Sequence, residues 1–367
     1  ADLGDVTATM EGSIVTSNLA IGTGTNLVVT GEGTLTSYVT KVEGDLTIGS
    51  AGHNLGTLTM GSESVLTIAT GTENTLAEVI GGDGSITGGS VLIDGDTTLS
   101  INGERLNGLG ITIAEGSTLN AASCSLSGNL TIQGTLNVGS SDFINYGATN
   151  QTITIDGGSL ELGENRVSVG GGNKLILNNA TITGTGDQHG AIDFFTNGGV
   201  VTSRGDSKID APIRLRADGN ITTMNVVDGV LTVTSVVNKG SGAFGDMSKT
   251  GAGTLLIDGS VDTAGVVSVM EGDVKLAEGA TVNSTLSLLG GSLSTSETAT
   301  AANVSGSGDI KVDASGSLTL TNASGLFNSK HIILMERIFF CFVRVVRRNA
   351  DDRFSSHLSD TPLKKFP

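Results

Sequence analysis

Residues 46–68 read LTIGSAGHNLGTLTMGSESVLTI, and one tripeptide pattern occurs three times within them, as Leu46–Ile48, Leu58–Met60 and Leu66–Ile68. Each copy places a threonine between two apolar residues. Alternation with a period of two, in residues that favour strands, predicts a β-strand with one buried face and one solvated face. Further copies, with Thr or Ser in the middle, follow at Leu99–Ile101, Ile111–Ile113, Leu130–Ile132, Ile153–Ile155, Val167–Val169, Leu286–Leu288 and Leu318–Leu320.

Glycine-rich turns separate these strands, as in Gly81–Gly84 and Gly170–Gly172. Glycine allows the positive φ angles that tight corners need. Strands this short do not make a free-standing sheet, but coils of two or three such strands can stack and bury one aliphatic column. We therefore expect residues 1–328 to form an all-β, parallel β-helix, or β-solenoid. An array of Greek-key β-sandwiches is the alternative.

The composition also favours a thin rod over a compact globule. The 367 residues include 55 glycines and 3 prolines, and aromatic residues make up only 3%. A compact core normally uses aromatic rings to fill its centre. The net charge of −17 offers no basic face to nucleic acid or to an anionic membrane. No uncharged apolar stretch reaches the length of about 18 residues that a membrane helix needs, so we expect no transmembrane segment.

Two features bear on the compartment in which the protein works. The two cysteines, Cys124 and Cys341, lie far apart in unlike surroundings, so we expect no disulfide framework. The sequence begins at Ala1, as a mature protein does after its signal peptide has been removed at a small residue, although an arbitrary boundary gives the same start. If the protein is exported and has no disulfides, its stability must come from the repeated stacking of similar coils.

Residues 329–367 differ from the rest of the chain. All 55 glycines precede residue 326, whereas this tail holds eight of the 20 Lys and Arg residues but four of the 37 Asp and Glu residues. One interpretation is an amphipathic capping helix, with one face formed by Lys330, Arg337, Arg344 and Arg348. The other is an out-of-frame extension of a truncated gene, which the abrupt change in composition favours.

Residues 248–259 read SKTGAGTLLIDG, and valine-rich and Gly-x-Val segments follow at Val266–Val269 and Gly272–Leu276. This stretch resembles the autotransporter-associated β-strand repeat, also called the passenger-associated transport repeat, whose core is Lys-Thr-Gly-x-Gly-Thr-Leu. The best match spans residues 207–295, and a weaker one follows at Gly306–Leu320. The positions that match the core are Lys249, Thr250, Gly251, Gly253, Thr254 and Leu255.

The resemblance implies a right-handed β-helix passenger that is exported and held at the outer membrane. The tail departs from the family pattern, in which a membrane anchor follows the rod. Members are mostly adhesins and surface structures, and those with enzymatic activity carry it on additional modules. We therefore expect an exported bacterial surface rod, structural or adhesive and not an enzyme. Its expected partners are a host surface, a glycan or neighbouring cells.

One tripeptide, Arg204-Gly205-Asp206, matches a sequence known for integrin recognition. A turn would display the Arg and the carboxylate on opposite sides, as such a receptor requires. A charged solenoid corner that only aids solubility has the same composition, and this plainer interpretation is favoured.

The segment 187–216 gathers acidic, basic and aromatic residues. Neighbouring coils of a β-helix bring side chains to one face, where two carboxylates can act as general acid and base. Polysaccharide lyases and glycosidases use such arrangements, and the candidate catalytic residues here are Asp187, Asp193, Asp206 and Asp210. The chain has no tryptophan for sugar platforms, so an irregular loop with paired charges is the favoured interpretation.

No cofactor and no metal site are expected. Gly240–Gly245 matches a dinucleotide fingerprint, but a glycine turn follows it where a helix is required. Gly81–Gly84 resembles half of a calcium-binding repeat and does not recur in tandem. The four histidines are scattered and form no metal-spaced set with the cysteines.

Overall fold

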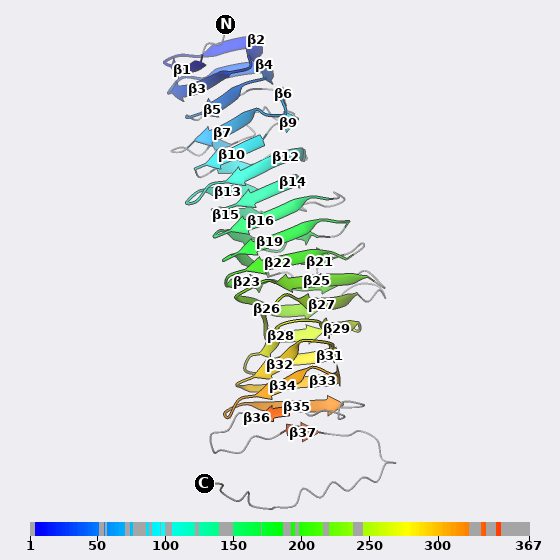
Figure 1. The fold of residues 1–367 in the computed structure, drawn as a ribbon. Helices are drawn as coiled ribbons and strands as arrows, with labels where there is room; N and C mark the ends of the chain where they lie inside the picture. The colour runs from blue at the N-terminus through cyan, green and yellow to red at the C-terminus, as the bar shows by residue number, and fades with distance from the viewer. Residues whose placement is uncertain are drawn as a thin grey trace, which may run out of the picture.

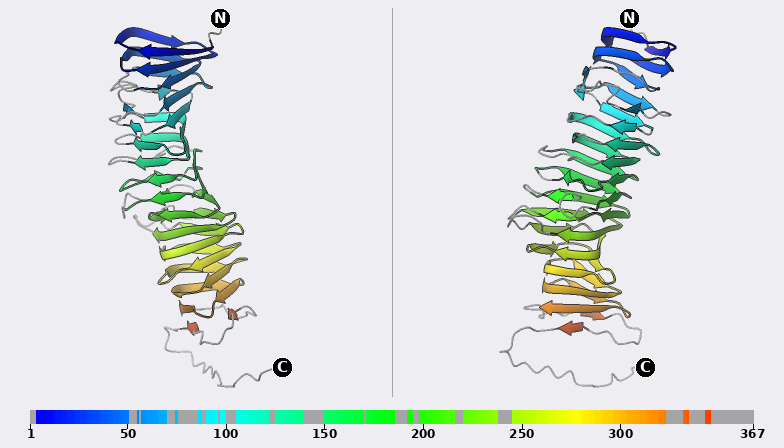
Figure 2. Two further views of the ribbon diagram at one scale, coloured as in Figure 1. Left: turned by 90° about the vertical axis from the view of Figure 1, so that its left-hand side faces the viewer. Right: turned by 180° about the vertical axis from the view of Figure 1, so that it is seen from behind.

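The computed structural model of the chain is a long stack of β-strands (Figure 1). The residues that it describes contain 37 strands and no helix. The stack is elongated from every side, with the first and last strands at opposite ends (Figure 2). The described residues are 4–50, 55, 57–69, 74–75, 86–87, 90–95, 97–99, 105–121, 125–138, 150–169, 171–185, 192–194, 198–215, 220–237, 245–322, 332–334 and 343–345.

Successive turns of the chain add strands to three stacks. The first stack contains β1 (Gly4–Met10), β3 (Thr25–Gly31), β5 (Asp45–Ile48), β7 (Val65–Ala69), β10 (Ser90–Asp94), β12 (Arg105–Ile113), β14 (Ser125–Ile132), β16 (Thr152–Asp156), β19 (Lys174–Asn178), β22 (Val200–Arg204), β25 (Ile221–Val226), β27 (Asp246–Thr250), β29 (Val266–Val269), β31 (Thr281–Leu288) and β33 (Thr298–Gly306). The second contains β8 (Asn74–Thr75), β11 (Thr97–Leu99), β13 (Thr118–Ala121), β15 (Thr135–Val138), β17 (Ser159–Glu161), β20 (Thr181–Thr183), β23 (Ser207–Asp210), β26 (Val230–Val237), β28 (Thr254–Asp262), β30 (Asp273–Leu276), β32 (Ser292–Thr295), β34 (Asp309–Val312) and β36 (Ile332–Leu334).

The third stack is less regular. It contains β2 (Ile14–Ile21), β4 (Leu35–Val42), β6 (Thr57–Met60), β9 (Ile86–Thr87), β18 (Val167–Ser168), β21 (Ile192–Phe194), β24 (Ile213–Leu215), β35 (Ser317–Asn322) and β37 (Val343–Val345). Several long strands pass from one stack into the next, and their pairing register shifts at that point, as between Val233 and Ser235 of β26. These shifts are the corners of the solenoid.

Every strand pairing among the described residues is parallel. The tripeptides lie over one another: Ile48 pairs with Ile68, Ile68 with Ile93, and Ile93 with Ile113. The predicted parallel β-solenoid is therefore confirmed. The Greek-key alternative is wrong, because its strands would pair antiparallel.

A narrow aliphatic column fills the inside of the rod. Leu130 and Ile132 of one tripeptide are 2% and 0% exposed, whereas Thr131 between them is half-buried on the outer face. Burying each such Leu or Ile side chain contributes about 1.5–3 kcal/mol. Among the described residues, Phe194 is the only aromatic side chain in the core. The low aromatic content thus reflects a core that is only a few side chains wide.

Two short strands of the tail continue the stack. β36 pairs with β34, and β37 pairs with β35, both in parallel. Parallel pairing therefore extends past residue 328, where the change in composition suggested that the solenoid ends, because a short apolar run can add to an open strand edge without glycine-rich turns. The other residues of 329–367 lie outside the described part of the chain. They include three of the four basic residues of the expected capping helix, Lys330, Arg337 and Arg348.

Candidate functional site

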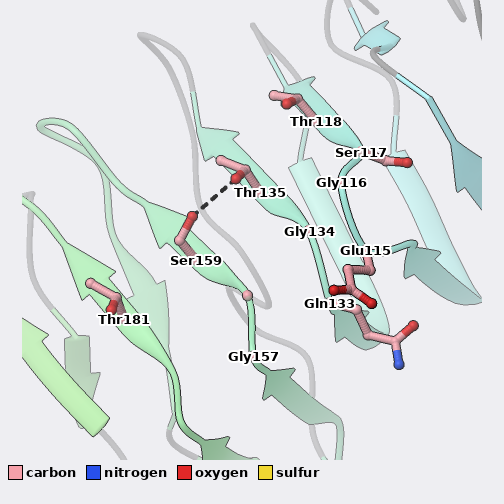
Figure 3. A pocket seen from close by; sticks show the side chains of 11 residues that line it. Glu115, Gly116, Ser117, Thr118, Gln133, Gly134, Thr135, Gly157, Ser159 and Thr181 are labelled. Atoms are coloured by element: carbon pink, nitrogen blue, oxygen red, sulfur yellow. Dashed lines mark hydrogen bonds between the residues drawn. The ribbon is translucent and has the colours of Figure 1, made fainter.

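A shallow groove runs along one corner of the solenoid, between the first and second stacks (Figure 3). Its volume is about 360 Å³. Four turns of the chain line it, through Glu115–Thr118, Gln133–Thr135, Gly157–Ser159 and Thr181. Glu115 is its one charged residue, so the groove offers mainly hydroxyl, amide and backbone groups to a ligand.

Glycines leave the floor of this groove as bare backbone. A Cβ atom on Gly134 would lie 2.1 Å from the carbonyl oxygen of Ser117, and a Cβ on Gly158 would lie 2.4 Å from the carbonyl oxygen of Gly134. Both distances are far inside van der Waals contact. A side chain at either position would push successive turns apart. The absence of side chains at these two glycines therefore explains both the close stacking of the corners and the groove.

A row of outward polar residues continues from the groove across the second stack. On β13, β15, β17 and β20, a fully buried Leu or Ile separates two outward polar residues. The outward residues pair in register from turn to turn. We call this surface the polar strip, and it consists of Thr118, Asn120, Thr135, Asn137, Ser159, Glu161, Thr181 and Thr183.

Hydrogen bonds within the polar strip run along the rod. Ser159 Oγ donates to Thr135 Oγ1 at 3.1 Å (Figure 3), and Asn137 Nδ2 donates to Asn120 Oδ1 at 2.8 Å. Such ladders hold the side chains in fixed positions. Because hydroxyl and amide groups can each form several hydrogen bonds, the strip is suited to a polar polymer that lies along the rod.

The tripeptide Arg204-Gly205-Asp206 forms the corner between β22 and β23. Its glycine has a φ of +60°, and a Cβ there would lie 2.2 Å from Asn179 Oδ1 of the preceding turn. Both charged groups contact the following turn. The arginine Nη1 lies 3.8 Å from Asp228 Oδ2, and the aspartate Oδ1 accepts a hydrogen bond of 3.0 Å from Val230 N. The tripeptide is thus a stacked corner whose carboxylate stabilises the backbone of the next turn.

Asp193 is a buried counter-charge in the third stack. It pairs in register with Ser168 on one side and Arg214 on the other, and it is only 1% exposed. Its Oδ2 lies 3.2 Å from Arg166 Nη1. A carboxylate that is withdrawn from solvent and contacts an arginine is poorly placed to reach a substrate.

Two other candidate carboxylates flank β23 of the second stack. Asp206 is exposed at the corner described above, and Asp210 is exposed at the end of β23, where its Oδ2 lies 3.1 Å from Lys208 Nζ. Asp193 belongs to a different stack, so the structure does not bring these three carboxylates together. Asp187 lies outside the described residues.

The residues of the repeat motif occupy one corner between the first and second stacks. Lys249 and Thr250 end β27, and Thr254 and Leu255 begin β28. Between them, Gly251 has a φ of +77° and Gly253 packs where a Cβ would lie 2.8 Å from a methyl of the preceding turn. The glycines of the motif are therefore explained by the positive φ angle of the corner and by the close stacking of successive turns.

Within the described residues, no three His, Cys, Asp or Glu side chains are arranged to hold a metal ion. The same part of the chain contains no helix of the length and apolar character needed to cross a membrane. Several predictions fall outside the described residues, namely those for Gly81–Gly84, the four histidines, the two cysteines and most of Gly240–Gly245.

Comparison with known proteins gives no relative. No protein-family model, curated protein or solved structure matches the chain. The fold and the surface chemistry are therefore the guides to function.

Proposed function

We propose that the chain is a structural or adhesive rod of the bacterial surface, exported and organised like an autotransporter passenger. The observation that carries the proposal is the parallel pairing of the first stack from β1 to β33 in a long, thin body (Figure 1). On the second stack, outward polar residues pair in register from turn to turn. The Lys-Thr-Gly-x-Gly-Thr-Leu likeness at 249–255 supports export by this route. Such a rod displays a binding surface away from the cell.

The polar strip is the proposed contact surface. Its hydroxyl and amide groups recur once per turn at the inter-strand spacing of about 4.8 Å. A partner with repeating hydroxyl groups, such as a glycan, can make the same weak contact at each turn. Affinity then comes from the number of contacts, as in other multivalent interactions. The net charge of −17 disfavours strongly anionic partners.

Adhesion is preferred to catalysis because of where the carboxylates lie. Asp193 is buried against Arg166, whereas Asp206 and Asp210 are exposed and already paired with neighbouring groups. A glycosidase needs two carboxyl groups roughly 5–10 Å apart on either side of one bond. The polar strip itself contains one carboxylate, Glu161.

The proposal is tested by the adhesion of beads coated with the protein to glycan-coated surfaces. The double variant Thr135→Lys and Ser159→Lys places two long cations on the polar strip and is expected to reduce adhesion at least tenfold. The control is Thr131→Lys and Thr154→Lys, which makes an equal change at half-buried outward positions of the first stack. Equal adhesion of the two variants, or no adhesion of the wild type to any glycan, would contradict the proposal that the polar strip is the surface that binds a glycan.

Two further measurements separate location and catalysis from binding. Protease treatment of intact producing cells is expected to remove the chain, because a surface rod is accessible from outside. Incubation with a glycan panel is expected to release no reducing sugar. Release that is lost in Asp193→Asn or Asp206→Asn would instead identify a polysaccharide-cleaving enzyme.

A further inference from the structure

One lysine lies inside the aliphatic column. Lys249 pairs in register between Met224 and Val269, at a position that is apolar on the turns on both sides. It is 0% exposed, and it is the only buried lysine among the described residues. A lysine at a core position requires that its ammonium group find hydrogen-bond partners within the protein.

The ammonium group binds the backbone of two successive corners. Lys249 Nζ donates to the carbonyl oxygens of Thr250 at 2.9 Å and Gly251 at 2.7 Å, both in its own turn. It also donates to the carbonyl oxygen of Glu271 at 3.0 Å, in the following turn. An ammonium group has three donors, and these three acceptors use all of them. The side chain therefore links two turns from inside the core.

Burial and charge act on this lysine in opposite directions. Burial lowers the pKa of Lys249 from 10.5 to about 8, and the carboxylates of Glu271 and Asp273 oppose that shift. At neutral pH the group is still protonated, and the lowered pKa shows that burying the charge costs more than the two carboxylates return. The link between the corners therefore depends on the three hydrogen bonds, which are charge-assisted and about twice as strong as neutral ones.

Glycines make room for the ammonium group. Gly251 and Gly272 have φ angles of +77° and +72°. A Cβ on Gly272 would lie 2.7 Å from Lys249 Nζ and 2.4 Å from the carbonyl oxygen of Gly251. We call Lys249, Thr250, Gly251, Glu271 and Gly272 the lysine clasp, because each of them either makes or permits the link between the two corners.

We propose that the lysine clasp makes the turns from β27 to β30 the last part of the rod to separate. In a solenoid, each turn is held only by its neighbours, so one strengthened interface sets where unravelling stops. Corners elsewhere in the described residues are joined by backbone hydrogen bonds, such as Val227 N to Ser203 O at 2.9 Å, without a buried ammonium group. The inference concerns mechanical integrity and does not depend on what the rod binds.

Hydrogen exchange followed by mass spectrometry tests the lysine clasp. In the wild type, amides of 253–257 and 270–276 are expected to exchange at least tenfold more slowly than those of 152–156. In Lys249→Met, which keeps an apolar stem in the column, this protection is expected to be lost. Lys275→Met removes a half-buried lysine from the outer face of β30 and should leave it intact. Equal exchange in the two variants would overturn the proposal.

A second pair of variants covers the case in which Lys249→Met does not fold. Gly272→Ala places a methyl group against Nζ and against the carbonyl oxygens of Gly251 and Gly253, whereas Gly306→Ala, at a φ of +107°, places one against the backbone of Leu288. A larger rise in exchange at the corner of Gly272→Ala than at the corner of Gly306→Ala supports the lysine clasp. Equal rises at the two corners would refute it, because backbone contact and strain would then be the whole effect.

Discussion

Replacing Leu175 with alanine tests whether the aliphatic column holds the rod together. Leu175 is fully buried on β19 and pairs with Ile153 on one side and Val201 on the other. The change removes three carbon atoms, which costs about 2.4 kcal/mol at about 0.8 kcal/mol for each buried methylene. The turns on both sides hold the space open, so a cavity adds to this cost. We expect a total loss of about 3–4 kcal/mol, within the usual range for buried leucines.

Ile176→Ala is the matched control for Leu175→Ala. Ile176 is the next residue on the same strand and loses the same number of carbon atoms, but its side chain is half-buried on the outer face. We expect a loss of about 1 kcal/mol or less. Urea unfolding followed by far-ultraviolet circular dichroism measures both losses. Equal losses would refute the assignment of inner and outer faces.

Hydrogen exchange on Leu175→Ala measures how far along the rod the loss of amide protection extends. Protection should fall in the adjacent strands β16 and β22 and stay unchanged in the distant β33, because each turn contacts only its neighbours. A uniform fall along the whole rod would mean that the stack opens as one cooperative unit, contrary to this reasoning.

Three further predictions concern corners and buried charge, and urea unfolding measures each of them. Gly116→Ala, at a φ of +77° with open space around it, should cost about 1–2 kcal/mol of stability. Gly229→Ala, at a φ of +65°, should cost more because its Cβ would meet the backbone carbonyl oxygen of Gly205 at 2.2 Å, and equal costs would contradict close stacking at that corner. Asp193→Asn should cost about 3–5 kcal/mol because it removes the buried carboxylate charge that Arg166 Nη1 contacts at 3.2 Å, whereas Asp210→Asn, which breaks a half-exposed pair, should cost about 0–1 kcal/mol. The pKa of Lys249 is lowered to about 8 in the folded chain, so the unfolded chain binds more protons between pH 8 and pH 10.5. The free energy of unfolding of the wild type, relative to that of Lys249→Met, should therefore rise with pH over this range. If this difference in free energy did not change with pH, the amine would be solvated in the folded chain.

The fold could be predicted because its signal is local and repeated. In Ile153-Thr154-Ile155, two side chains face inward and one faces outward, whichever strands lie on either side. Each copy of the pattern repeats the same information, and the glycine-rich turns limit how far apart successive strands lie. The parallel arrangement follows because each coil repeats the same inward and outward pattern, so equivalent strands of successive coils stack on one another.

The candidate site could not be predicted, because it depends on register. Thr135 and Ser159 become neighbours only when β15 and β17 pair, and the turns that separate such strands differ in length along the chain. The sequence also does not show that Asp193 is buried while Asp206 is exposed, since both are aspartates in one charged segment. The sequence Thr-Leu-Asn occurs at both Thr118–Asn120 and Thr135–Asn137, and this repetition is a local sign that the two asparagines form a hydrogen-bonded ladder.

The unequal lengths of the turns have a consequence for what this scaffold can carry. Val29 pairs with Ile48, 19 positions later, and Ile68 pairs with Ile93, 25 positions later, yet both pairs keep the same inward alignment. Added residues are therefore accommodated between strands, and the levels above and below are not displaced. A peptide inserted there would sit at a chosen height along the rod, so epitopes or enzymes could be mounted at intervals that are multiples of about 4.8 Å.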